Sequence, residues 1–298
     1  MLPWNAAVNG KRRFCGSSCY RAASGQTAKT QIDPTYVKPP IKWAGGKHWL
    51  LDCLAPLWEK HSDRRLVEPF CGALAVALGL RPAKALLNDI NPHLVNFHRW
   101  LQRGLTIDIT MEYDKDAYYR ARDRFNELIR YPQSDGGKES ASLFYYLNRS
   151  CFNGLCRFNS SSEFNVPFGR YDKDKVKYRR DFSAYQAAYS GWTFTVRDFQ
   201  EVTFNAGDFV NVDPPYDGNE TAFTSYSAQD FNWGDQVRLV KWLDRHDGPV
   251  VASNLATERI LALYSDHGFT IETIEAPRRI NNTGDRTPAR EMLATRGI

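Results

Sequence analysis

The sequence predicts an α/β protein with a Rossmann-like sheet and a helical insert. Two observations predict the sheet: short apolar segments of strand character alternate with helical segments near both ends of the chain, and polar loops follow several of them. A third observation predicts the insert, because residues 106–190 carry long, charged and aromatic helical patterns. Strands that alternate with helices indicate a three-layer sheet, and the helical interruption indicates an inserted subdomain.

The first predicted element is an amphipathic helix that follows a glycine loop. The pair Pro39-Pro40 favours an extended entry, and Gly45-Gly46 favours a tight loop after it. Apolar residues then recur at helical spacing over residues 47–58. We therefore expect the ordered part of the chain to begin near residue 36.

Two strand, loop and helix units follow this helix. Residues 64–70 (RRLVEPF) have the pattern of a short buried strand, and residues 73–80 (ALAVALGL) that of an apolar helix. The scheme is repeated by a strand over residues 85–87 (ALL), an acidic turn at residues 88–89, and a helix entered at Pro92.

Beyond the insert, strand patterns return five times. Each is a short run of apolar and β-branched residues bounded by turn-forming residues. These strands are expected over residues 192–199 (WTFTVRDF), 208–216 (DFVNVDPPY), 249–256 (PVVASNLA), 269–276 (FTIETIEA) and 290–296 (REMLATR).

The composition is that of a globular protein. The 298 residues are 42 % hydrophobic and 24 % charged, with a formal net charge of +5. No apolar run reaches the roughly 18 residues of a membrane span, and the N-terminus lacks the apolar core of a secretory signal. Because residues 1–30 are basic and contain no acid, we expect a disordered basic extension over residues 1–35. We expect a cytoplasmic protein.

Two further features of composition bear on partners. In residues 170–180 (RYDKDKVKYRR), Lys and Arg outnumber Asp, which suits a phosphate backbone; a solvated surface is the alternative. The six cysteines include no C-x-x-C pair and have no His at ligand spacing beside them. We therefore expect free thiols and no metal site.

Four polar loops fall where predicted strands end. They cover residues 68–72, 88–91, 198–199 and 213–216, and ligands of open α/β sheets bind at such ends. Asp89 follows the first loop by about 20 residues, the placement of an acid that binds ribose hydroxyls, although a helix cap would look the same. The G-x-G-x-x-G, P-loop, G-x-S-x-G and H-E-x-x-H patterns are absent, which disfavours dinucleotide, NTP and hydrolase sites.

The tetrad DPPY, residues 213–216, suits the activation of an amino group. Pro214 and Pro215 have no backbone N–H, so the Asp213 carboxylate and a nearby carbonyl remain available as two acceptors that face one spot. The lone pair of an aromatic amine is delocalised into the ring, which makes the nitrogen a poor nucleophile. Two acceptors that take hydrogen bonds from both N–H groups let the nitrogen recover this lone pair, while Tyr216 stacks on the ring. An ordinary DPP turn is the alternative.

Together these segments resemble the Dam-type family of DNA adenine-N6 methyltransferases, of the α group and D12 class. The resemblance covers roughly residues 40–297. It rests on DPPY together with KWAGGK (42–47), EPFCGAL (68–74), NDIN (88–91), YYLNRSCFNGLCRFNSSSEFNVPFGRY (145–171) and RRINNTGDRTPAREMLATRG (278–297).

The resemblance implies a Rossmann-like class I SAM-dependent methyltransferase sheet with a helical DNA-recognition insert. The implied domains are a catalytic domain over residues 36–105 and 191–298 and a target-recognition subdomain over residues 106–190. The implied reaction methylates N6 of a flipped adenine in double-stranded DNA, at a GATC-type site, with S-adenosylmethionine as methyl donor and no metal. The implied protein is a monomer or weak dimer in a bacterial or phage-infected cell.

Carried over by position, the resemblance also assigns residues to the donor and to catalysis. Asp213, Pro214, Pro215 and Tyr216 would hold the flipped base. The implied donor contacts are Trp43 and Lys47 at the methionine end, Phe70 and Gly72 in the pocket wall, Asp89 on the ribose, Ile90 on the adenine ring, Asp198 on the adenine amino group, and Asp213. At Leu74 this chain departs from the usual Gly-Ala-Gly loop. A leucine there can narrow the donor pocket, and we expect weakened donor binding at most, not its loss.

The insert would read the DNA. Arg157 matches the position of a guanine reader, Leu155 and Pro167 would contact thymine methyls, and Phe152 would fill the space that the flipped base leaves. Packing in the core is the alternative for Phe152 and Leu155. The complete set of implied DNA contacts is Lys42, Arg149, Phe152, Asn153, Leu155, Arg157 and Pro167.

Two other functions stay open at this point. A cytosine-N4 DNA methyltransferase would use the same acceptors around an amino group. A non-catalytic DNA-binding relative would be explained by Leu74 if that residue blocks the donor.

Overall fold

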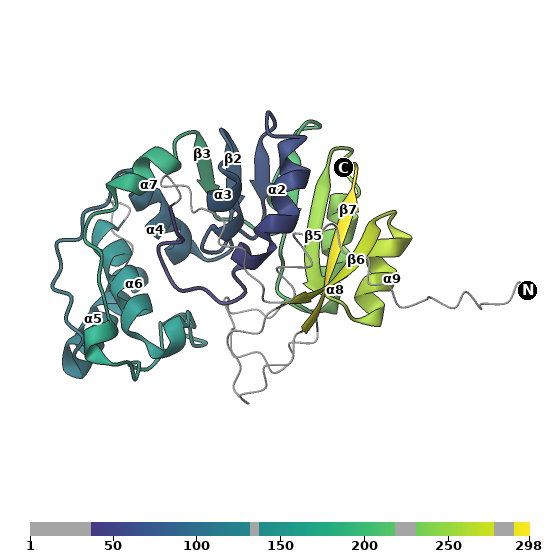
Figure 1. Cartoon of the computed structure of the whole chain (residues 1–298). Coiled ribbons are helices and arrows are strands. Elements are labelled where there is room, and N and C mark those ends of the chain that lie inside the picture. Colours follow the sequence, from purple (N-terminus) through teal and green to yellow (C-terminus); the bar gives the residue numbers. More distant parts are fainter. Residues whose placement is uncertain (1–36, 132–136, 218–230, 277–288) are drawn as a thin grey trace, which may run out of the picture.

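A seven-stranded sheet forms the centre of the molecule in the computed structural model, which describes residues 37–131, 137–217, 231–276 and 289–298 (Figure 1). The expected N-terminal extension, residues 1–35, lies outside the described residues. The strands are β1 (Leu66–Glu68), β2 (Ala85–Asn88), β3 (Trp192–Thr195), β4 (Phe209–Val212), β5 (Val250–Leu255), β6 (Thr270–Ala276) and β7 (Ala289–Arg296). All seven predicted strands are confirmed, several of them shorter than their patterns.

The strand order is β3-β2-β1-β4-β5-β7-β6. The first five strands pair in parallel, and β7 runs antiparallel between β5 and β6. The chain continues from β1 to its neighbour β2 on one side, whereas β4 is followed by β5 on the other. The switch in strand order therefore lies between β1 and β4.

Helices cover both faces of the sheet (Figure 1). One face packs against α2 (Leu51–Glu59), α3 (Ala75–Leu80) and α4 (Pro92–Gln102), and the other against α8 (Trp233–Leu243) and α9 (Glu258–Asp266). Successive strand residues alternate between the two cores, as Phe209 does with Val210. Such burial on both faces explains why the strands are almost continuously apolar.

The ends of α4 show how local sequence sets an element. The side chain of Asn91 accepts hydrogen bonds from the backbone N–H groups of His93 and Leu94, and Pro92 occupies the first turn. An Asn cap followed by proline is a favoured helix start. The predicted entry at Pro92 is confirmed. The first predicted helix, in contrast, is split into a 3-10 turn, η1 (Lys47–Leu50), and α2.

The segment 106–190 is mainly helical, as predicted. It contains α5 (Lys115–Arg130), α6 (Lys138–Ser150) and α7 (Ser183–Ala188), with the 3-10 turns η2 (Phe152–Gly154) and η3 (Lys173–Lys175). A fourth such turn, η4 (Phe199–Glu201), follows β3. The buried side chains of the segment belong to the same apolar core as α2, α3 and α4. The amide of Asn148 on α6 also donates to and accepts from the backbone of Lys42, which anchors the insert to the loop before η1.

The expectation of free thiols is confirmed for three of the described cysteines. Cys71, Cys151 and Cys156 are buried and free. Cys53 is disulfide-bonded, so the expectation is wrong for this residue. The positions of cysteines along a chain do not by themselves decide which of them are oxidised.

Candidate active site

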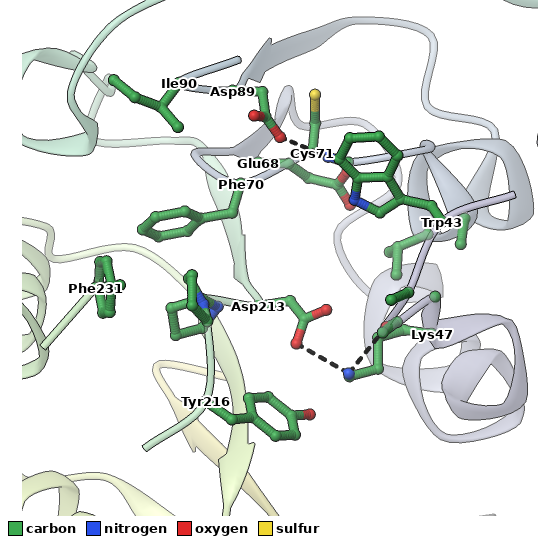
Figure 2. A pocket seen from close by; sticks show the side chains of 18 of the residues that line it. Trp43, Lys47, Glu68, Phe70, Cys71, Asp89, Ile90, Asp213, Tyr216 and Phe231 are labelled. Carbon is green, nitrogen blue, oxygen red and sulfur yellow. Dashed lines mark hydrogen bonds and ion pairs between the residues drawn. The ribbon is translucent and has the colours of Figure 1, made fainter. Parts of the chain in front are cut away.

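A cavity of about 740 Å³ opens at the switch in strand order, beyond the carboxyl ends of β1, β2 and β4 (Figure 2). Open α/β sheets bind ligands in this place. The lining residues lie within the segments 43–47, 68–76, 89–90, 211–217 and 231–233, together with Arg259. Three of the four predicted polar loops therefore line one cavity; the loop 198–199 does not.

The buried side chain of Lys47 joins the glycine loop to the end of β4. Its Nζ lies 3.1 Å from Oδ1 of Asp213, donates to the carbonyl of Gly45 at 3.0 Å, and lies 4.5 Å from the centre of the Tyr216 ring (Figure 2). A buried ammonium needs such compensation for the water that it loses. The predicted residues Lys47, Asp213 and Tyr216 thus form one group.

Asp213 keeps part of its carboxylate available. Both of its partners contact Oδ1, namely Lys47 and the hydroxyl of Ser253, which donates at 2.8 Å. Oδ2 and the carbonyl of Pro214 receive no hydrogen bond from the residues that the structure describes, whereas the carbonyl of Pro215 accepts from Gln236 at 2.8 Å. Two acceptors therefore remain where β4 ends, as the DPPY pattern predicts.

The backbone at Gly72 favours glycine. Its φ is +48°, and a Cβ there would lie 3.0 Å from Nε1 of the Trp43 indole. Both the left-handed backbone and the close approach of the indole disfavour a larger residue. Trp43 and Gly72 thus lie against each other in the wall of the cavity.

Asp89 accepts hydrogen bonds from two backbone N–H groups. Gly72 donates to Oδ2 at 3.1 Å and Asn91 donates to Oδ1 at 2.9 Å (Figure 2). Burial raises the pKa of Asp89 to about 6, against the lowering effect of these two donors. The carboxylate is therefore ionised above about pH 6 and retains lone pairs for further donors.

Apolar side chains lie beside Asp89. Ile90 is 47 % exposed although it lines the cavity. The centre of the Phe70 ring lies 5.6 Å from that of Phe231 (Figure 2). It lies 5.5 Å from the centre of the Phe199 ring. This part of the cavity can take a flat ring. Phe231 was not predicted, because it stands far from every predicted loop in the sequence.

Glu68 and Asn211 are two further lining residues that the predicted site lacks. The amide of Asn211 donates to Oε1 of Glu68 at 3.0 Å. Burial, and to a smaller extent the charge of Asp213, raises the pKa of Glu68 to about 8. Glu68 is therefore protonated at neutral pH. Its sequence signal was an acid as the last residue of a buried strand.

Asp198 lies outside the cavity lining. Its carboxylate accepts from the guanidinium of Arg238 at 2.9 and 3.1 Å and from the backbone N–H of Gln200. The structure therefore does not bring Asp198 together with the other predicted donor contacts. Arg238 lies over the ring of Phe199 and so holds this pair at the edge of the aromatic group.

Five of the seven predicted DNA contacts, Phe152, Asn153, Leu155, Arg157 and Pro167, lie in the loop region that follows α6. The N–H of Phe152 donates to the carbonyl of Pro167 at 2.9 Å, and Phe152, Asn153 and Pro167 are exposed. Leu155 is half-buried, as is Arg157, whose Nε donates to the side chain of Asn165 at 2.8 Å. The core alternative is wrong for Phe152, which is 37 % exposed.

Lys42 and Arg149, the two remaining predicted DNA contacts, interact with residues of the segment 171–177. The ammonium of Lys42 lies 3.8 Å from the centre of the Tyr171 ring. Burial, and then the charge of Arg149, lowers the pKa of Lys42. Arg149 donates to the carbonyl of Lys177 at 3.3 Å. Both cationic side chains therefore contact residues of the insert.

Leu74 does not narrow the cavity. Its side chain is fully buried in the core and is not among the lining residues, which include its neighbours Ala73 and Ala75. The backbone of Leu74 is nevertheless left-handed, with φ +65°, a conformation that favours glycine. The departure from Gly-Ala-Gly therefore strains the turn and fills the core, and it leaves the cavity open.

We expect Leu74→Gly to lower the free energy of unfolding by about 2 kcal/mol, because the loss of a buried leucine outweighs the relief of a left-handed backbone. Arg81→Gly is the matched control, since Arg81 is exposed and also left-handed, with φ +51°. It should change stability by less than about 1 kcal/mol. Urea unfolding measures both variants, and a Leu74→Gly protein more stable than the parent would contradict the assignment.

The described part of the chain shows no group of three or more His, Cys, Asp or Glu side chains placed to hold a metal ion. Across the same described ranges, no helix has the length and apolar character needed to cross a membrane.

Comparison with known proteins gives a consistent result. Residues 43–280 match the family model of the D12 class N6 adenine-specific DNA methyltransferases. A DNA N-6-adenine-methyltransferase of Escherichia phage P1 is 33 % identical over 94 % of this chain, which spans 38 % of the length of that protein. The type II methyltransferase M.MjaIII of Methanocaldococcus jannaschii is 32 % identical, over 84 % of this chain and 95 % of its own. A DNA adenine methylase of Vibrio cholerae is 33 % identical, over 85 % and 94 %.

Proposed function

Because the chain belongs to the D12 class of N6 adenine-specific DNA methyltransferases, we propose that it transfers a methyl group from S-adenosylmethionine to adenine N6 in a GATC-type site. The observation that carries the proposal is the pair of acceptors at the end of β4, Oδ2 of Asp213 and the carbonyl of Pro214. They border a cavity at the switch point of the sheet. Membership of an adenine-specific family disfavours the cytosine-N4 alternative.

The residues of the cavity suit S-adenosylmethionine. Asp89 has lone pairs for the ribose hydroxyls, and Ile90 and Phe70 offer apolar surfaces to the adenine ring. Trp43 and Lys47 would lie toward the methionine end. Asp198 would have to release Arg238 before it accepts the adenine amino group. The donor, when bound, supplies an electrophilic methyl group on a sulfonium sulfur.

The side chains at the end of β4 would do the rest of the chemistry. Asp213 and the Pro214 carbonyl each accept a hydrogen bond from one N–H of the target amino group. These two hydrogen bonds orient the amino nitrogen so that its lone pair points toward the methyl group. Tyr216 stacks on the base. As the new N–C bond forms, positive charge develops on the nitrogen, and the Asp213 carboxylate stabilises this charge and is placed to accept the departing proton.

The insert would position the DNA. We assign residues 106–190 to target recognition and residues 36–105 and 191–298 to catalysis. An exposed Phe152 next to Pro167 suits a wedge that fills the space of the flipped adenine, because a base inside the duplex cannot reach the cavity. The basic residues of the segment 170–180 would bind phosphates. The protein would act as a monomer or weak dimer on cytoplasmic DNA.

Nucleoside mass spectrometry tests the function. The protein is incubated with S-adenosylmethionine and either a GATC duplex or a GATG duplex at one salt concentration, since electrostatic binding depends on salt. N6-methyladenine in the GATC duplex alone is the expected result. Equal methylation of both duplexes would refute the proposed GATC specificity, and N4-methylcytosine in the product would refute adenine as the target base. The absence of any methylated base with excess donor would favour the non-catalytic DNA-binding alternative.

We expect Arg157→Ala to reduce the ratio of kcat/KM for GATC over GATG by about tenfold, because one bidentate guanine contact contributes about 1–3 kcal/mol of discrimination. Arg130→Ala is the control, since Arg130 lies on α5 of the same insert and pairs with Glu163. It should leave the ratio unchanged. A uniform loss of binding to both duplexes would instead assign Arg157 to a phosphate.

A further inference from the structure

Glu291 is a buried acid near the start of β7, directly before a run of buried apolar residues. It lies on β7, between Leu255 of β5 and Ile274 of β6, and is followed by the buried residues Met292 and Leu293. Only 8 % of its surface is exposed. A carboxylate costs free energy in such a place unless it is bound by partners. The partners of Glu291 therefore indicate why an acid stands there.

Among the described residues, Glu291 has two side-chain partners, and both belong to the group formed by Lys47, Asp213 and Tyr216. The hydroxyl of Tyr216 donates to Oε2 at 2.5 Å, and Nζ of Lys47 lies 3.9 Å from the same oxygen. Lys47 in turn contacts Asp213, and its ammonium lies over the Tyr216 ring. Glu291 itself is not among the residues that line the cavity. Within the described part of the chain, Glu291 therefore acts on the cavity through these two neighbours.

We propose that Glu291 is a positioning residue for methyl transfer, which holds the Tyr216 ring and the Lys47 ammonium in place beside Asp213. The inference rests on the proposed roles of Asp213 and Tyr216. The hydrogen bond from the Tyr216 hydroxyl to Oε2 of Glu291 fixes the ring at its far end, and the Lys47 ammonium beside the same oxygen favours the charged carboxylate, which strengthens that bond. The ring face is then set before the base arrives, which lowers the cost of stacking.

The charges of the group support this assignment. Two carboxylates, Asp213 and Glu291, share the single ammonium of Lys47. Burial raises the pKa of Glu291, while Lys47 and the Tyr216 hydroxyl lower it. Burial also raises the pKa of Tyr216, so its hydroxyl remains a donor. A neutral residue at position 291 would free the ammonium to move toward Asp213, so the arrangement depends on the charge and not only on shape.

Two variants break the same contact from its two sides. Tyr216→Phe removes the donor and keeps the stacking ring, and Glu291→Gln removes the charge and keeps the shape. We expect each to lower kcat by about tenfold or more, with KM for S-adenosylmethionine changed by less than about threefold. The double variant should be no slower than the slower single variant, because both changes remove one interaction.

The measurements separate this role from a structural one and from failure of the proposed function. Glu272→Gln, on the neighbouring strand β6, is the control and should keep the kcat of the parent. Folding is checked by circular dichroism, and base stacking by the fluorescence of 2-aminopurine at the target position. Single variants within about twofold of the parent kcat, or losses that multiply in the double variant, would overturn the inference. An inactive parent protein would instead sink the proposed function.

Discussion

Replacement of Asp213 by asparagine is expected to lower kcat by about 10²- to 10³-fold, the loss seen when one preorganised electrostatic group is removed from a site. The substituted side chain would keep the volume of the aspartate but lose the charge that stabilises the attacking nitrogen. One end of its amide would also present donors to the amino group in place of an acceptor. Binding of S-adenosylmethionine should change by less than about threefold, because the proposed contact of Asp213 is with the target base and not with the donor.

Single-turnover methylation of a GATC duplex measures the chemical step, and calorimetry measures donor binding. The control is Asp266→Asn, an exposed acid at the end of α9 that lies outside the cavity lining. It should behave like the parent protein. A donor that fails to bind the Asp213→Asn protein would assign Asp213 to the donor site and not to the chemistry.

Lys47→Met is expected to lower kcat by about 10²-fold and the free energy of unfolding by about 3 kcal/mol, since it leaves two carboxylates near each other without their cation. The Lys47 side chain is almost fully buried, and its ammonium contacts Asp213 at 3.1 Å. Methionine keeps the apolar length of lysine without the charge. The losses of kcat and of stability should therefore arise from the missing charge more than from a change in packing.

The pH dependence of this variant has a definite sign. Lys47 opposes the effect of burial on Glu291, so its removal raises the pKa of Glu291 further. A carboxyl whose folded pKa lies above its unfolded value binds more protons in the folded state. The stability of the variant relative to the parent therefore falls as pH rises from the unfolded pKa of Glu291 to its folded pKa. The pH at which activity is lost on the acidic side of the pH–rate profile should also move to a higher value.

Thermal melting and initial rates across about pH 5–9 check both statements. The double variant Lys47→Met/Glu291→Gln should recover part of the lost stability, because it removes the uncompensated carboxylate, but it should not recover kcat. Identical pH profiles for Lys47→Met and the parent would contradict the assigned charge network.

The fold was largely predictable because its signals are local. The strand at 209–212 is an apolar run bounded by turn residues, and α4 starts at an Asn cap followed by Pro92. Such patterns depend on residues a few positions apart. The DPPY acceptors were predictable for the same reason, since two prolines without N–H groups follow Asp213 directly. The family motifs then related these local signals to one another.

The surroundings of several site residues depend on distant partners. Leu74 has a left-handed backbone, and its side chain is buried in the core and does not line the cavity. Asp198 lies outside the cavity lining, and Arg238, 40 positions away, binds its carboxylate. Glu291 was not predicted at all, because nothing near it in the chain indicates that Tyr216 and Lys47 would meet it.

By itself, the sequence determined the seven strands, the helical insert, the family and the acceptors at the end of β4. Periodicity, capping and proline chemistry act through neighbours in the chain and so can be read from it. Only the tertiary structure decided that Glu291 from the last strand, Lys47 from the glycine loop and Tyr216 after β4 share one charge network. The physical reason is that parallel pairing of β4 with β5 and antiparallel insertion of β7 bring distant residues together, and the energy of a buried charge depends on which of them arrive.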